Sequence, residues 1–302
     1  MGTPDFAVSS LQLLLEHDCN IVAVITAPDK PAGRGMKLQE STIKKFAVEK
    51  GLKVLQPVNL KDPEFVASLA ALNADIQVVV AFRMLPEVVW SQPPMGTINL
   101  HASLLPQYRG AAPINWVIIN GEKETGVTTF KLQHEIDTGN ILLQKKVAIA
   151  KDENAGQLYE VLKKTGAELL LETLKQLAEG NIPEHSQHEL VQAITELKVA
   201  PKINKETCLI SWEKTADEIY NLIRGLSPYP GAYTIWNDKI LKVFSCSKEI
   251  FETSNVPGSI SSDNKTYMRI ACSNGYIYLL SVQPEGKKRM SIEDFLRGYT
   301  VI

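Results

Sequence analysis

One stretch in the first half of the chain holds the residue types that an acyl-transfer site requires. Polar and apolar residues alternate over 97–101, so a strand there carries Asn99 and His101 on one face. An amide N–H beside an imidazole can donate hydrogen bonds to a carbonyl oxygen that becomes negative during acyl transfer. Asp137, in the Asp-Thr-Gly at 137–139, would hold the imidazole in one tautomer and take a proton from an attacking amine. These three residues are the predicted catalytic set.

Each element taken alone has a structural explanation. An Asn-x-His pair on a strand is more often a structural histidine with its hydrogen bonds satisfied. Asp-Thr-Gly is more often a turn in which Asp bonds its own backbone and Gly supplies a positive φ. The Ser-Leu-Leu-Pro at 103–106 fits an ordinary loop, and Arg109 before Gly110 fits a surface arginine at a turn. Only the combination favours a catalytic site.

That combination resembles the formyltransferase family that takes its formyl group from 10-formyltetrahydrofolate. The Asn-x-His, Ser-Leu-Leu-Pro-x-x-Arg-Gly and Asp-Thr-Gly elements of the family all occur here, in order. The resemblance implies that Asn99, His101 and Asp137 are catalytic and that 10-formyltetrahydrofolate is the co-substrate. It also implies a folate-contacting loop made of Ser103, Leu104, Leu105 and Pro106.

Features outside this set must identify the acceptor, because the family also includes enzymes that formylate glycinamide ribonucleotide or amino sugars and a domain that hydrolyses formyltetrahydrofolate. Residues 28–38 predict an exposed basic loop, since their Pro and Gly disfavour regular structure. This loop resembles the one with which tRNA formyltransferases enter the acceptor stem, which makes Arg34 and Lys37 predicted tRNA contacts. Without the resemblance, a solvated basic loop would be the favoured interpretation.

The last third of the chain predicts short strands separated by Asn-Asp and Asn-Gly turns, and a small β-barrel is the natural way to close them. The predicted strands are 232–236, 239–245, 267–273 and 276–282. The Ser-Pro-Tyr-Pro-Gly at 227–231 and the Gly-Lys-Lys at 286–288 resemble the barrel domain of the same tRNA formyltransferases. Lys287 and Lys288 are therefore predicted to contact tRNA, with a solvated turn as the alternative.

Before residue 183 the pattern alternates strands with helices, which is typical of an α/β domain with a Rossmann-like, mostly parallel sheet. The predicted strands are 21–26 and 75–82, and the predicted helices are 62–73, 112–120 and 154–178. The predicted organisation is a catalytic domain at 1–183, a polar linker at 184–201 and an OB-like β-barrel at 202–302. The absence of Gly-x-Gly-x-x-Gly argues against a dinucleotide.

The chain departs from the family at two places. Thr3 as N-cap and Pro4 as first helical residue predict a helix to Glu16, but the short apolar strand that precedes this Gly-Thr-Pro in the family is not in the sequence. We hypothesise that the natural product starts several residues upstream; mass spectrometry showing Met1 or Gly2 as the endogenous first residue would contradict this. Arg83 stands where the family has an Ala-Tyr-Gly segment, so the wall of the folate pocket is expected to differ there.

Composition sets the remaining bounds. A chain of 302 residues with 44% apolar residues favours two cores. No stretch predicts a membrane span or a signal peptide, so a cytoplasmic protein is expected. Four cysteines without metal-type spacing predict free thiols and no metal site. The net charge of −2 argues against a protein that binds nucleic acids generally as polyanions. Separately, a monomer is expected.

The resemblance as a whole predicts an enzyme that formylates the α-amino group of methionine on initiator tRNA, giving N-formylmethionyl-tRNA for translation initiation. A formyltetrahydrofolate hydrolase or a sugar-amine formyltransferase would use the same trio. Neither of these explains the Arg34 loop joined to a C-terminal barrel. A non-catalytic tRNA-binding protein would explain the barrel but not the intact trio.

Overall fold

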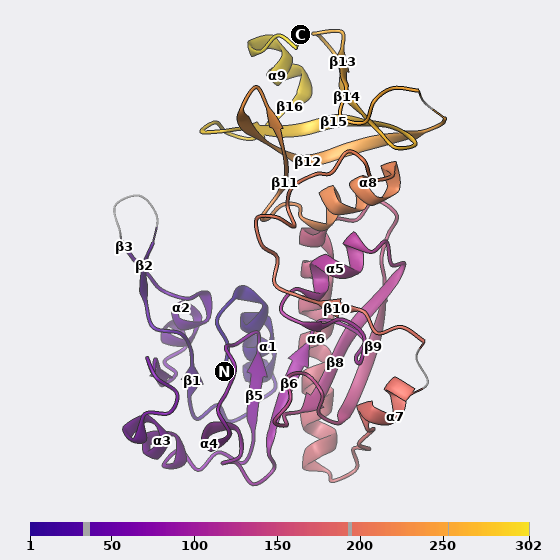
Figure 1. Cartoon of the computed structure of the whole chain (residues 1–302). Helices are drawn as coiled ribbons and strands as arrows, with labels where there is room; N and C mark the ends of the chain where they lie inside the picture. Colours follow the sequence, from indigo (N-terminus) through magenta and orange to yellow (C-terminus); the bar gives the residue numbers. More distant parts are fainter. Residues whose placement is uncertain (33–36, 193–194, 253, 302) are drawn as a thin grey trace. The chain divides into compact units, whose positions relative to one another are not determined.

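The computed structural model describes residues 1–32, 37–192, 195–252 and 254–301 (Figure 1). They form two compact units. The first consists of Met1–Arg109, Gly126–Val147 and Glu160–Lys198, and the second of Gly110–Thr125, Ala148–Tyr159 and Val199–Ile302. The predicted α/β class with a separate C-terminal antiparallel sheet is confirmed. The predicted domain boundaries at 183 and 201 stay predictions.

The main sheet of the first unit runs in the order β5 (Gln77–Val80), β6 (Thr97–His101), β8 (Glu124–Lys131) and β9 (Ile141–Ala148). β6 is parallel to β5 and antiparallel to β8. Ile98 and Leu100 are buried almost completely, as the alternating pattern predicts, whereas Asn99 on the same strand is half-buried. β6 therefore has a neighbour on each side, which gives the polar residues of this strand a rigid support.

Two additional strand pairs belong to this unit. They are β1 (Val24–Ile25) with β4 (Val54–Leu55) and β2 (Lys30–Ala32) with β3 (Lys37–Gln39).

The first two residues of the chain lie between β1 and β5. Gly2 donates its N–H to Ile25 O at 3.0 Å, and Val80 donates to Met1 O at 2.9 Å. A Cβ on Gly2 would come within 2.5 Å of the Ala7 side chain, so only glycine fits this bridge. Residues 1–2 thus connect β1 to β5.

Helices of different lengths flank these strands. They are α1 (Asp5–Glu16), α2 (Thr42–Glu49), α3 (Pro63–Ala70), α4 (Glu87–Trp90), α6 (Ala155–Ala178, of which 155–159 belong to the second unit) and α7 (Gln187–Gln192). The predicted N-cap Thr3 is wrong by one residue, because Pro4 keeps an extended conformation and the helix begins at Asp5. The prediction that 28–38 is wholly irregular is also wrong. The hairpin tolerates Pro31, which pairs with Leu38, because two-stranded pairing leaves alternate N–H groups unbonded.

The second unit is built on an antiparallel sheet. Its strand order is β11 (Ala232–Trp236), β12 (Lys239–Ile250), β15 (Gly275–Pro284), β14 (Met268–Cys272) and β13 (Ile260–Ser262), with β16 (Met290–Ser291) paired to β15. The remaining elements are β7 (Arg109–Gly110), α5 (Pro113–Ile119), β10 (Val199–Ala200), α8 (Ala216–Gly225) and α9 (Ile292–Gly298). The pairings among the described residues follow an open path from β11 to β13, and a closed barrel stays a prediction.

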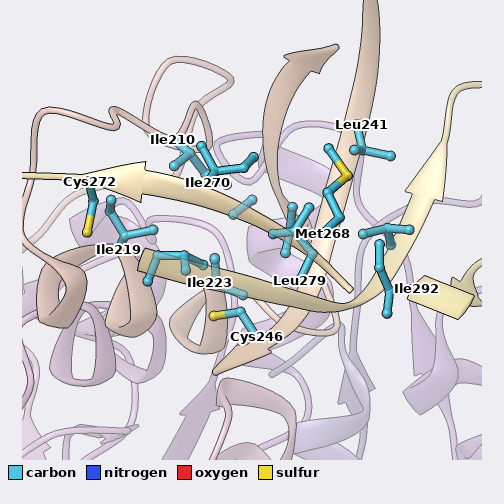
Figure 2. Packing of buried hydrophobic residues seen from close by; sticks show 14 of the residues in the cluster. Ile210, Ile219, Ile223, Leu241, Cys246, Met268, Ile270, Cys272, Leu279 and Ile292 are labelled. Atoms are coloured by element: carbon cyan, nitrogen blue, oxygen red, sulfur yellow. The ribbon is translucent and has the colours of Figure 1, made fainter. Parts of the chain in front are cut away.

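One hydrophobic core holds this sheet and its helices together (Figure 2). α8 begins with a capping box, in which Thr215 and Glu218 satisfy each other's backbone N–H groups. The helix then presents Ile219 and Ile223 to the core, where both are buried almost completely. No helix among the described residues is both long enough and apolar enough to span a membrane.

Candidate active site

Asn99 and His101 lie on β6, at the end of the parallel pair where ligands bind in α/β sheets. Their backbones pair with Phe130 and Thr128 of β8, which fixes both Cα positions. His101 is 6% exposed, and Asn99 is half-buried. The Asn99 side-chain amide has no hydrogen-bond partner within the described residues.

The two ring nitrogens of His101 have different partners. Nε2 lies 2.9 Å from the backbone oxygen of Tyr108, and a carbonyl can only accept, so Nε2 carries a proton. Nδ1 lies 4.0 Å from a carboxylate oxygen of Asp137. Nδ1 can therefore donate a hydrogen bond only when the ring carries a second proton. The structure brings together two members of the predicted trio, His101 and Asp137, with the tautomer set by Tyr108.

Asp137 lies in the turn between β8 and β9. The structural alternative, a turn in which Gly139 supplies a positive φ, does not apply, because Asp137 itself has φ 55° and Gly139 is absent from the positive-φ residues. Gly139 is required for a different reason. A Cβ at this position would come within 1.6 Å of Lys131 O. The close approach of the two strand ends thus places the Asp137 carboxylate near His101.

The predicted folate loop, 103–106, is held by its own polar contacts. The Ser103 hydroxyl is buried and donates to Gln107 O at 2.7 Å. Thr128 Oγ1 donates to Ser103 O at 2.7 Å and accepts from Leu105 N at 3.1 Å. Leu105 and Pro106 are buried, and Leu104 is the one half-exposed residue of the four. The loop is therefore well positioned, and its contact with folate stays a prediction.

Sequence reasoning missed the residue that links this site together, Gln187. It lies inside the predicted linker, where a polar composition suggested solvent exposure, yet it is 1% exposed. Its side-chain oxygen accepts from Arg109 Nε at 3.0 Å and from Arg109 Nη2 at 2.6 Å. Burial lowers the pKa of Arg109, while the carboxylates of Asp137 and Glu135 oppose the shift. No local pattern distinguishes a buried glutamine from a solvated one, so only the fold reveals this contact.

The structure describes three of the four residues predicted to bind tRNA. Arg34 lies outside the described residues. The Lys37 backbone pairs with Ala32 in the β2–β3 hairpin. Lys287 and Lys288 are exposed in the turn between β15 and β16.

Arg83, where a changed pocket wall was expected, is exposed and donates to two backbone oxygens. Nη1 bonds Val58 O at 2.9 Å, and Nη2 bonds Pro57 O. All four cysteines are free thiols. Within the described ranges, no cluster of three His, Cys, Asp or Glu side chains is arranged to hold a metal ion.

The chain combines a Rossmann-like α/β unit, in which His101 Nδ1 lies 4.0 Å from Asp137, with an antiparallel sheet unit, and both parts match models of the formyltransferase family. The family model described as "Formyl transferase" matches residues 2–174, and "Formyl transferase, C-terminal domain" matches 202–300. A protein of Bacteroides fragilis named methionyl-tRNA formyltransferase is 50% identical over 99% of this chain and 94% of its own length. One of the same name from Parabacteroides distasonis is 52% identical over 100% and 95%. The chain belongs to the methionyl-tRNA formyltransferase family.

Solved structures share the fold at lower identity. WlaRD, described as a sugar 3N-formyl transferase in the presence of dTDP and 5-N-formyl-THF, has a TM-score of 0.67 and 24% identity, over 95% of this chain and 97% of its own. HypX from Aquifex aeolicus in complex with tetrahydrofolic acid has a TM-score of 0.59 and 20% identity. This chain covers 44% of HypX, which covers 83% of this chain. At identities below 25%, these two structures show that the fold is shared and nothing about the activity of this chain.

Proposed function

We propose that this chain transfers the formyl group of 10-formyltetrahydrofolate to the α-amino group of methionine esterified to initiator tRNA. The observation that carries the proposal is the identity of about half of all residues with curated methionyl-tRNA formyltransferases over nearly the whole chain. The pairing of His101 with Asp137, beside the amide of Asn99, supplies groups for the chemistry. The product serves translation, so we place the reaction in the cytoplasm, and we propose a monomer.

The chemistry requires positioning more than a strong base. An α-amino group has a pKa of roughly 7 to 8, so a sizeable share of it is already neutral. The amine nitrogen attacks the formyl carbon, and Asn99 together with the protonated Nδ1 of His101 donates hydrogen bonds to the formyl oxygen as it becomes negative. Asp137 takes the proton of the amine, directly or through a water, and passes it to the folate nitrogen as the bond between that nitrogen and the formyl carbon breaks.

The substrate contacts follow from the same proposal. The loop of Ser103, Leu104, Leu105 and Pro106 would contact folate, and the hydrogen bonds of Thr128 that hold the loop in place support this role. Arg34, Lys37, Lys287 and Lys288 would contact the phosphates of the tRNA, and the exposure of the last two supports their part in it.

The decisive assay measures transfer of labelled formyl from 10-formyltetrahydrofolate to charged initiator Met-tRNA. Charged elongator Met-tRNA and a reaction without acceptor run beside it. Transfer to the initiator alone is the expected result. Label released equally without tRNA would instead identify a hydrolase, label accepted by an amino sugar would identify a sugar formyltransferase, and tRNA binding without turnover would identify a binding protein.

Substitutions test the catalytic assignment. Asn99→Ala and Asp137→Ala should each lower kcat by about two orders of magnitude, which is typical for the loss of a donor to a developing oxyanion or of a proton acceptor. Glu135→Ala is the matched control, because this exposed carboxylate lies in the same turn. Near-normal turnover of either site variant, or an equal loss in the control, would refute the assignment.

Salt titrations test the tRNA contacts. Each lysine that neutralises a phosphate adds about one unit to the slope of log affinity against log salt concentration. Lys287→Ala and Lys288→Ala should therefore each reduce that slope by about one unit. Lys205→Ala changes another charge in the same unit and is the control. An unchanged slope for both turn variants would remove these lysines from the interface.

A further inference from the structure

Gln187 uses every hydrogen-bonding position of its side-chain amide inside the first unit. Its nitrogen donates to Asp137 O at 3.0 Å and to Gly139 O at 2.7 Å. Its oxygen accepts both hydrogen bonds from Arg109. An amide has two N–H donors and two acceptor lone pairs, so all four are occupied. A fully satisfied buried amide of this kind holds its partners in a single geometry.

On the donor side, Gln187 fixes the turn that carries Asp137. Asp137 has φ 55°, a left-handed conformation that costs free energy for a residue with a Cβ and persists only where surrounding contacts hold it. The bonds to Asp137 O and Gly139 O fix the peptide planes that directly follow Asp137 and Gly139, two planes of the same turn. The direction of the Asp137 side chain toward His101 therefore depends on these two bonds.

On the acceptor side, Gln187 fixes Arg109, the residue directly after Tyr108. The carbonyl of Tyr108 is the group that holds His101 Nε2, and Tyr108 itself has φ 60°. The Gln187 side chain therefore binds both segments that contact the His101 ring. One segment carries the carbonyl that faces Nε2, and the other carries the carboxylate that faces Nδ1. A shift of either segment would change the distance between Nδ1 and the Asp137 carboxylate.

The chain just before Gln187 is itself bound to the same strand ends. Ile141 and His185 exchange two backbone hydrogen bonds of 2.9 Å. Glu184 binds the ammonium of Lys131 and accepts from Asn140 Nδ2 at 3.1 Å, and these contacts lower the pKa of its carboxyl. The hydrogen bonds of residues 184 and 185 therefore hold the backbone next to Gln187 in place, beside the turn that carries Asp137.

We infer that Gln187 is a positioning residue for the His101–Asp137 pair and that residues 184–187 act as a strap that keeps the pair in its productive geometry. The inference rests on the proposed function for its effect on turnover, whereas its effect on the geometry of His101 does not. A side-chain amide is needed, because it donates to two carbonyls and accepts from a guanidinium at the same time.

Two substitutions separate the roles of the amide. Gln187→Met keeps the length and removes all four bonds, and Gln187→Glu can still pair with Arg109 but turns an anion toward two carbonyl oxygens. Both should lower kcat by about tenfold to a hundredfold with KM values within about twofold, as for other partners that orient a reacting group. Gln192→Met, at an exposed position of the same helix, should leave both constants unchanged. Near-normal kcat in Gln187→Glu would overturn the inference.

A double-mutant cycle distinguishes positioning from general damage to the fold. In an Asp137→Ala background, Gln187→Met should lower kcat by less than about twofold further, because the group it positions is already gone. Losses that multiply in full, with equal folded fractions by circular dichroism, would overturn the inference.

An NMR readout stays informative if the proposed function fails. The imidazole signal of His101, assigned with His101→Gln, should shift in Gln187→Met and stay in place in Gln192→Met. An unmoved signal would overturn positioning whatever the activity. A shifted signal together with full turnover of Asp137→Ala would instead refute the catalytic assignment and leave the positioning intact.

Discussion

In protein produced with Met1 as its first residue, the Met1 amino group provides a stability prediction whose size follows from the structure. The Met1 side chain is partly exposed, but its amino group is buried and donates to Val78 O at 2.6 Å. Burial lowers the pKa of this group from 8.0 to about 5 because the surrounding protein solvates the ammonium poorly. Met1 also lines a cavity of about 260 Å³ beside β1 and β5.

The shift makes the first unit more stable as the pH rises. Below pH 5 the amine is protonated in both states, and the folded state bears the full cost of a buried cation. Between pH 5 and 8 the folded state has released its proton while the unfolded state still binds one, so the free energy of unfolding increases. A depression of three pKa units corresponds to about 4 kcal/mol over this window. Above pH 8 the amine is neutral in both states and the contribution is constant.

The assay compares protein with a free Met1, verified by intact mass, and the same protein acetylated at its amino group. Hydrogen exchange of the β5 amides under increasing urea reports the first unit separately from the second. The free energy advantage of the acetylated form should be about 4 kcal/mol larger at pH 5 than at pH 8.5. Other titrating groups contribute equally to both forms and cancel. A difference between the two forms that does not change with pH would refute the reasoning.

Three further outcomes are expected. Gly139→Ala, whose Cβ would meet Lys131 O at 1.6 Å, should lower the urea midpoint and abolish most turnover, whereas Gly298→Ala, with open space around it, should do neither. Burial raises the pKa of Cys246 to about 12, so a disulfide reagent at pH 8 should modify the half-buried Cys19 in the native protein and reach Cys246 only on unfolding; equal rates would contradict this. Phe295→Ala removes a fully buried ring and should cost the second unit about 3 to 5 kcal/mol, and a loss below about 1 kcal/mol by urea unfolding would show that the core does not depend on it.

Local patterns of the sequence were sufficient for fewer than half of the described elements, and strands such as β8 and β9 were not predicted. The buried run of β5, the amphipathic α6 and the hairpin strands β11, β12 and β15 lie where the residue patterns predict them, with ends shifted by a few residues. Helix starts were less certain, because one turn of chain offers several capping residues, and α1 begins after Pro4 instead of Thr3. The β2–β3 hairpin was missed because Pro and Gly disfavour strands locally, while cross-strand pairing decides the outcome.

By itself the sequence determined which residue types are present for the chemistry and in which order, and hence the family: Asn99 and His101 share a strand face because the period of a strand is two. Only the tertiary structure decided how they are held. The tautomer of His101 depends on a carbonyl seven residues away, the direction of Asp137 on a left-handed turn, and both on Gln187, which is 50 residues from Asp137. Such contacts are set by packing between distant segments, and burial of a polar side chain leaves no local periodicity in the sequence to reveal it.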